Sequence, residues 1–256
     1  MSRTSLFQRP VAGGNARANA YRSELRGIVA RYRRHKAAWD PHLAETKGIV
    51  RDAVALCPGR DRVVVLGSGP LLDVPLDDLL KAFREVVLVD IVHPMALRLR
   101  GLLSRQLHVL AIDLTGIGTQ PLSAQRRYEP PAMPPADLVI SLNLMSQLPI
   151  VPLNLLDKQG VEEEDADRFA KRLIAAHYKW LRNQPGQICL ITDVERIVYD
   201  LEGKKVMSFD PTYGIPLPEG GTEWEWAMAP VGEIAADGAL HHRVRGYPDL
   251  AAALAG

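Results

Sequence analysis

Small and acidic residues follow short apolar segments of this sequence, at positions where a chain can hold a small ligand. Gly67, Ser68 and Gly69 come directly after the apolar run 63–66, and Asp90 ends a second run 23 positions after Gly67. A glycine turn lets a ligand approach the backbone closely, and an acid at this spacing can reach the hydroxyls of a ribose. The pair therefore predicts a ligand that contains a nucleoside.

The residues around this turn favour a ligand with positive charge over a dinucleotide. A dinucleotide turn carries a third glycine, but Leu72 stands at that position. Pro70 and Pro75 lack backbone N–H groups for a phosphate, and Asp73 adds a negative charge. Asp73 has a second interpretation that suits either ligand, as the N-cap of a helix with Pro75 just inside it.

The elements that position these residues alternate along the chain. Apolar runs typical of buried strands occur at 63–66, 85–90, 108–113, 137–142 and 187–193. Between them, apolar residues recur at helical spacing over 41–57, 76–83, 95–106 and 162–183, the first with Asp40 as N-cap and Pro41 as first helical residue. After Asp193 the pattern changes to strands at 194–210, around a turn at 202–205, and at 223–230 and 241–247. The sequence predicts an α/β fold, a doubly wound and mostly parallel sheet with helices on both faces, an N-terminal helical lid and antiparallel C-terminal strands.

Four segments together resemble a known family. In their order and spacing, VVVLGSGP, VVLVDI, VLAIDLTG and DLVISLNLMSQLP are similar to the successive motifs of class I, Rossmann-like S-adenosylmethionine-dependent methyltransferases, over roughly residues 40–195. The resemblance implies S-adenosylmethionine as cofactor. It also implies these cofactor-binding residues: Gly67, Ser68 and Gly69 at the amino-acid end, Asp90 at the ribose, Ile91 packed on the adenine, Asp113 and Leu114 at the adenine edge, and Asn143 facing the methyl group.

Two positions depart from the family pattern. Val65 stands where the family often carries an acid that contacts the amino-acid end of the cofactor, and Leu71 stands where it often carries a glycine. These departures keep open a chain that binds the cofactor weakly or has lost it.

The methyl acceptor is less well defined by the sequence. The chain lacks the Asn/Asp-Pro-Pro-aromatic segment of nucleobase amine methyltransferases, and no acids suited to magnesium follow Leu142, so we expect no metal. No catalytic base stands out, since methyl transfer can depend on proximity and in-line orientation. His177 fits a hydrogen-bonded core position, while His241 and His242 should point to opposite faces of a strand. His42 is a candidate for a lid over the cofactor, and the aromatic residues of the C-terminal section either wall a substrate pocket or cover the sheet: Tyr199, Tyr213, Trp224, Trp226 and Tyr247.

Charge is concentrated at the N-terminus. Residues 1–36 contain nine Arg and Lys and a single acid, Glu24, and 21–39 read as a basic helix. We divide the chain into a basic arm at 1–39 and a Rossmann-like domain at 40–256, whose antiparallel section spans about 194–256. The arm either contacts nucleic acid or another anionic partner, or packs one apolar stripe on the domain.

These features lead to predictions about the cellular location and the function of the protein. Short apolar runs, the lack of a signal-like start and two cysteines indicate a cytoplasmic protein without a membrane span, of undefined oligomeric state. The function predicted first is methyl transfer to a small molecule. The alternatives are an RNA or protein methyltransferase that uses the basic arm, an NAD-dependent oxidoreductase, and a non-catalytic binding module.

Overall fold

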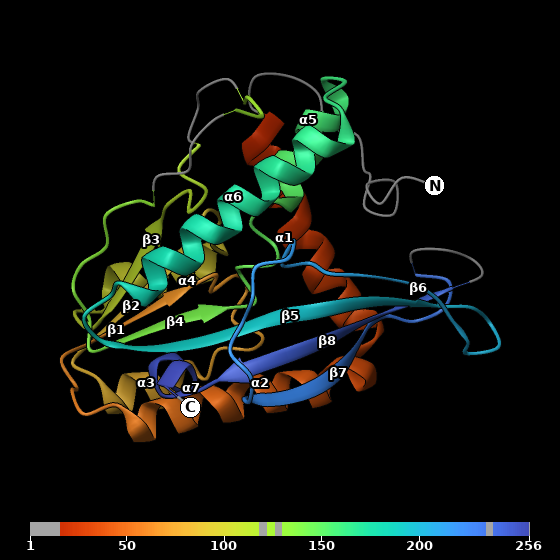
Figure 1. Cartoon of the computed structure of the whole chain (residues 1–256). Helices are drawn as coiled ribbons and strands as arrows, with labels where there is room; N and C mark the ends of the chain where they lie inside the picture. The colour runs from red at the N-terminus through yellow and green to blue at the C-terminus, as the bar shows by residue number, and fades with distance from the viewer. Residues whose placement is uncertain (1–15, 118–121, 126–129, 234–237, 256) are drawn as a thin grey trace.

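The structure, a computed structural model, describes residues 16–117, 122–125, 130–233 and 238–255, and all statements below refer to them. Its centre is a sheet of eight strands in the order β3-β2-β1-β4-β5-β8-β7, with β6 paired to β5 (Figure 1). The strands are β1 (Arg62–Leu66), β2 (Glu85–Asp90), β3 (Leu107–Ala111), β4 (Leu138–Leu142), β5 (Gln187–Tyr199), β6 (Lys205–Phe209), β7 (Thr222–Ala229) and β8 (Ala239–Tyr247).

The first five strands are parallel, as the unbroken apolar runs predict. Side chains of alternate residues enter two different cores, so that Val63 and Val65 face one layer of helices and Val64 and Leu66 the other. The strand order reverses between β1 and β4, which lie side by side. Ligands of doubly wound sheets bind at this point, beyond the carboxyl ends of the strands.

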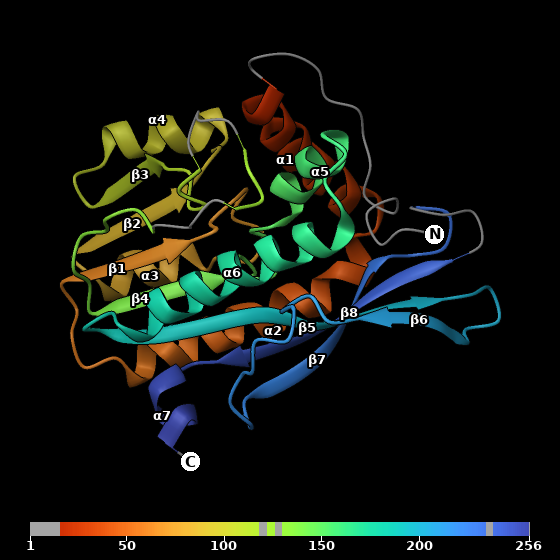
Figure 2. The same ribbon diagram turned by 45° about the horizontal axis from the view of Figure 1, so that its top comes forward.

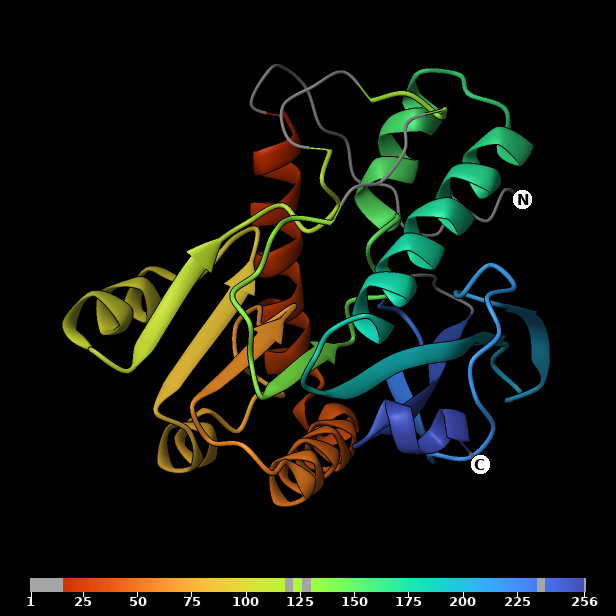
Figure 3. The ribbon, with the colours of Figure 1, turned by 60° about the vertical axis from the view of Figure 1, so that its left-hand side comes forward.

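Helices cover both faces of the sheet (Figures 2 and 3). One core contains side chains of α2 (Lys36–Leu56), α3 (Leu76–Ala82) and α4 (Met95–Leu103), and the other contains those of α5 (Ile150–Lys158), α6 (Glu163–Arg182) and α7 (Leu250–Ala255). Helix α1 (Ala16–Arg34) runs across the ends of the parallel strands, as Figure 3 shows, and its Ile28 and Tyr32 pack against the first of these cores. None of the helices in the described residues is long and apolar enough to cross a membrane.

The antiparallel section is built on a long β5. This strand continues beyond Asp193 to Tyr199, past an irregularity between Asp193 and Glu195 where its register with β8 shifts. β8 runs antiparallel to both β5 and β7, and β6 folds back on β5 as a hairpin, as the turn in the sequence predicts. The predicted fold class is therefore confirmed, including the antiparallel C-terminal strands.

The start of α2 differs from the prediction. Asp40 is not an N-cap and Pro41 is not the first helical residue, because α2 begins at Lys36 and both positions lie inside it. The preceding residues stay helical because Trp39 is buried and its indole N–H donates to the Met228 carbonyl at 3.0 Å. α2 thus passes through the division at residues 39 and 40, and the assignment of separate domains stays a prediction. α5 and α7 have no counterpart among the predicted helices.

Candidate functional site

The turn after β1 requires glycine at its first position. Gly67 has φ +78°, and a Cβ there would lie 2.8 Å from the Leu142 carbonyl oxygen on the neighbouring strand. Its N–H donates to the Val89 carbonyl at 2.9 Å, which fixes the turn against β2. Leu71, at the position where a glycine is expected, adopts φ +63°, a conformation that glycine favours. The loop therefore keeps a left-handed residue there without a glycine.

Asp90 connects the end of β2 to this turn. Its Oδ2 accepts the Gly69 N–H at 2.8 Å, and its Oδ1 accepts the Ile91 N–H at 2.7 Å. Burial raises the pKa of Asp90, while the backbone N–H groups oppose that shift. Oδ1 also accepts the Val92 N–H at 3.4 Å. Oδ2 can accept a second hydrogen bond, so this oxygen remains suited to a hydroxyl of a ligand.

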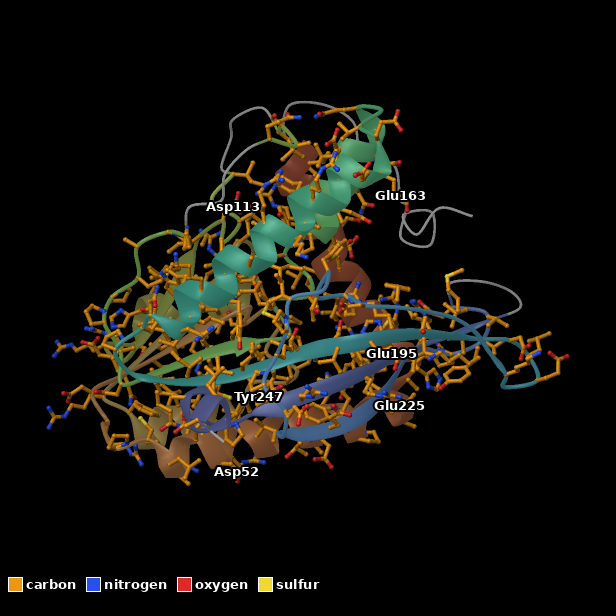
Figure 4. All side chains as sticks on the ribbon, viewed as in Figure 1. Asp52, Asp113, Glu163, Glu195, Glu225 and Tyr247 are labelled. Carbon is orange, nitrogen blue, oxygen red and sulfur yellow. The ribbon has the colours of Figure 1, made fainter. Side chains whose placement is uncertain are left out.

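Asp113 lies in the loop after β3, which ends earlier than predicted, at Ala111. The carboxylate accepts the N–H of Thr115 at 2.9 Å and also its hydroxyl, and Thr115 is buried. Leu114 is 7% exposed and belongs to the core on the α6 side. Figure 4 shows Asp113 close to β3, well away from Glu195 and Glu225 on the antiparallel section.

Asp73 is part of the site and does not cap a helix. α3 begins at Leu76, after Pro75, and no side chain caps it. The carboxylate of Asp73 instead accepts a hydrogen bond of 3.1 Å from the Asn143 side-chain amide. Asn143 is buried, has φ +50°, and its Oδ1 has no hydrogen-bond partner in the described part of the chain. Burial raises the pKa of Asp73 to about 6.

A cavity of about 480 Å³ brings these residues together. Seven of the eight predicted cofactor residues border it, and the exception is Ser68, which is fully buried under the turn. The seven are Gly67, Gly69, Asp90, Ile91, Asp113, Leu114 and Asn143. Asp73, in the loop between β1 and α3, also borders the cavity. The sequence alone does not distinguish an aspartate that binds a ligand at this position from one that caps the helix.

The cavity extends to the antiparallel section of the sheet. There its wall includes Trp39 and His42 of α2, Arg196 of β5, Trp226 of β7 and His242 of β8. Helix α1 borders the cavity with residues that include Leu25 and Ile28. The expected lid helix therefore borders the site, and His42, which is 2% exposed and lies in α2, is not part of this helix.

An ion cluster fastens α1 over the cavity. Glu233, in the loop after β7, pairs with Arg31 at 3.2 Å, with Arg34 at 2.5 Å and with His35 at 2.8 Å. These partners, Arg34 first, hold the pKa of Glu233 at about 2. Two arginines of the basic segment thus form ion pairs within the chain. The first 15 residues of the arm lie outside the described part of the structure.

The structure also places the histidines for which the sequence predicted a position. His177 is fully buried and its Nε2 lies 3.0 Å from the Ser141 hydroxyl, as predicted for a core histidine, and its pKa is lowered to about 3 by burial. His241 and His242 do face opposite sides of β8, since only His242 borders the cavity. Within the residues that the structure describes, no three His, Cys, Asp or Glu side chains gather as metal ligands would.

Comparisons with known proteins give likenesses of fold alone. No family model matches the chain, and no curated protein sequence matches it. A 1,6-didemethyltoxoflavin N1-methyltransferase of Burkholderia thailandensis, with S-adenosylhomocysteine bound, is 13% identical, with a TM-score of 0.38 over 93% of this chain and 92% of that one. The N-methyltransferase NodS of Bradyrhizobium japonicum, also with S-adenosylhomocysteine, is 12% identical, with a TM-score of 0.34 over 79% and 85%. A methyltransferase of Leishmania major is 13% identical, with a TM-score of 0.34 over 80% and 73%.

Proposed function

We propose that the protein is an S-adenosylmethionine-dependent methyltransferase that acts on a small molecule. The observation that carries this proposal is the meeting of the glycine turn, Asp90, Asp113 and Asn143 around one cavity, at the reversal of strand order. The carboxylate of Asp90 suits the ribose hydroxyls, and Asp113 with Leu114 suits the adenine. The methionine end then lies between Gly67, Asn143 and Asp73.

The charges at this end of the cavity suit a cationic ligand. Asp73 and Asp113 border it from the loops after β1 and β3, and Asp90 from the end of β2. The described residues of the loops after these three strands that border the cavity include no Lys or Arg. S-adenosylmethionine has an ammonium and a sulfonium that such a surface stabilises. Asp73 is an acid near the expected amino-acid end, and we propose that it takes the place of the acid missing at Val65.

The same features disfavour a nicotinamide dinucleotide. A pyrophosphate usually binds where a glycine turn leads directly into a helix, with the helix N–H groups facing it. Here α3 begins nine positions after Gly67 and has only seven residues. Pro75 precedes it, and Asp73 would repel the phosphates.

The acceptor that we propose is small because the cavity is covered. Its volume of about 480 Å³ lies in the range of small-molecule sites, roughly 300 to 1,000 Å³. α1 lines part of it, and the ion pairs of Glu233 with Arg31 and Arg34 leave these arginines engaged with the protein. These contacts support a lid over a small acceptor more than a surface for RNA.

Calorimetric titration of the purified protein with S-adenosylmethionine, S-adenosylhomocysteine and NADH tests the proposal. We expect micromolar binding of both adenosyl ligands, its loss in Asp90→Ala, and no change in Asp77→Ala, a matched exposed carboxylate on α3. Folded protein that binds neither adenosyl ligand would refute the methyltransferase. Nucleic-acid binding with a steep salt dependence and no cofactor binding would favour the binding module.

A further inference from the structure

The end of the cavity over the antiparallel strands has an aromatic wall. The His42 ring stacks on Trp226 with centroids 4.0 Å apart and planes at 7°, and Trp39 meets Trp226 edge-on at 4.8 Å. Hydrogen bonds fix the rings, since Trp224 Nε1 donates to His42 Nδ1 at 3.0 Å. Burial lowers the pKa of His42 to about 3, so this ring stays neutral. Rigid aromatic surfaces of this kind favour flat, apolar ligands.

A buried carboxylate lies behind this wall. Asp193 is fully buried, and its Oδ2 accepts the Ser146 hydroxyl at 3.1 Å and the Arg196 guanidinium at 2.9 and 3.2 Å. Burial alone would raise the pKa of Asp193, but the charge of the Arg196 guanidinium and its hydrogen bonds outweigh burial and keep the carboxylate ionised. Its other oxygen, Oδ1, has no hydrogen-bond partner among the described residues.

His242 lies between this carboxylate and the cavity. Its Nδ1 is 3.1 Å from Asp193 Oδ2, a close polar contact without hydrogen-bond alignment, and the ring meets Trp226 edge-on at 5.3 Å. In the described part of the chain, His242 Nε2 and Trp226 Nε1 are both buried without hydrogen-bond partners. Buried polar atoms that are left unpaired destabilise the protein. His242 Nε2 as an acceptor and Trp226 Nε1 as a donor can therefore each form a hydrogen bond with a polar group of a ligand.

The charges around His242 define its protonation. Asp193 and Arg196 face it from β5, His42 from α2 and Arg31 from α1. Burial, followed by Arg196 and Arg31, lowers the pKa of His242 against the attraction of Asp193. The ring is therefore neutral at pH 7, with its proton on the nitrogen nearest Asp193 and a lone pair on Nε2.

We propose that this end of the cavity binds a flat aromatic acceptor with a hydroxyl group, and that His242 Nε2 takes the hydroxyl proton during methyl transfer. This inference rests on the proposed methyltransferase function. The hydroxyl oxygen forms a bond to the methyl carbon as the carbon–sulfur bond breaks, and the sulfur keeps that electron pair, giving S-adenosylhomocysteine. The proton moves to Nε2, and Asp193 stabilises the imidazolium until the proton passes to solvent. A neutral amine would not need such a base, which is why we assign an oxygen nucleophile.

4-Nitrophenol tests the assignment, because its phenolate absorbs at a longer wavelength than its phenol. Calorimetry with S-adenosylhomocysteine comes first, on wild type, His242→Gln and the matched control His241→Gln, whose ring lies on the other face of β8 and contacts Glu225. The probe is then added to each complex below its own pKa. We expect bound phenolate in wild type and His241→Gln, and at least tenfold less in His242→Gln. With 2-naphthol and S-adenosylmethionine, methylation should fall at least a hundredfold in His242→Gln alone.

Each failure has a distinct meaning. Folded protein without affinity for S-adenosylhomocysteine would refute the proposed function and this inference with it. Cofactor binding without binding of either phenol would refute the acceptor class, and equal ionisation in His242→Gln and wild type would refute the base. If the buried substitution prevents folding, nitrogen NMR of histidine-labelled wild type replaces it. One imidazole must then become doubly protonated when 4-nitrophenol binds, and an unchanged spectrum would overturn the proposal.

Discussion

Replacing Asp73 by Asn should stabilise the ligand-free protein and weaken cofactor binding. Burial raises the pKa of this carboxyl from 3.8 to about 6, so ionisation of Asp73 destabilises the folded chain. A shift of about 2 units corresponds to roughly 3 kcal/mol. Because Asp73 borders a cavity and is only partly buried, solvent reduces this cost, and we expect about 1–2 kcal/mol. Asn removes the charge and can still accept the hydrogen bond from Asn143.

The stabilisation should depend on pH in a defined direction. Below about pH 4 the carboxyl is protonated in both states, so wild type and Asp73→Asn should be equally stable. Between pH 4 and 6 the unfolded chain releases the proton while the folded chain retains it, and wild type loses stability relative to the variant. Above pH 6 the difference should stay constant. Urea unfolding at pH 4 and 7.5 measures this, with the exposed Asp78→Asn as control.

Cofactor affinity should change in the opposite direction. A charge-assisted hydrogen bond from the ligand ammonium to Asp73 is worth about 1.5–3 kcal/mol. Its loss should weaken S-adenosylmethionine binding roughly ten- to hundredfold in calorimetry at pH 7.5. A variant that is less stable than wild type at pH 7.5 and binds the cofactor equally well would refute the reasoning. Asp73 would then be only a structural partner of Asn143.

Three further predictions concern the turn, the lid and the core. Gly67→Ala should lower the free energy of unfolding by about 2–4 kcal/mol, and Gly69→Ala by only about 1–2. A Cβ at Gly67 would lie 2.8 Å from a carbonyl oxygen, whereas the nearest atoms to a Cβ at Gly69 are 3.9 Å away; equal losses in urea unfolding would contradict this. Glu233→Gln should loosen α1, so proteolysis within α1 and release of bound S-adenosylhomocysteine should both accelerate, and unchanged rates would show that the ion cluster does not hold the lid. The pKa of His177 is lowered to about 3, so as pH falls below 6.5 the unfolded chain binds a proton that the folded chain does not, and stability falls by about 1.4 kcal/mol per unit. His177→Gln should show a correspondingly smaller acid dependence in urea unfolding, and an unchanged slope would contradict a buried neutral imidazole.

Local sequence patterns were sufficient for the parallel half of the fold. Strands β1, β2 and β4 are short apolar runs that hydrogen-bond inside a covered sheet, and such runs are recognisable without their neighbours. The glycine turn and Asp90 are equally local, because both follow directly from a strand end. Their meeting in one cavity follows from the rule that parallel strands end at the same edge of the sheet.

The start of α2 and the role of Asp73 were not determined locally. Asp-Pro commonly begins a helix, but burial of Trp39 against the antiparallel strands extends α2 to Lys36. Asp73 has the local pattern of a helix cap, yet its partner is Asn143, 70 residues further on. A distant contact overrides a local sequence preference when it buries more apolar surface or gives a buried polar group a hydrogen-bond partner.

The sequence by itself determined which segments are strands, and it predicted where a nucleoside ligand would contact them. Only the tertiary structure decided what lies at the other end of the cavity. The contact of His242 with Asp193 and the hydrogen bond from Trp224 to His42 join residues far apart in the chain. These pairs exist because β8 inserts between β5 and β7, and strand order depends on the packing of the whole sheet, which no local pattern encodes.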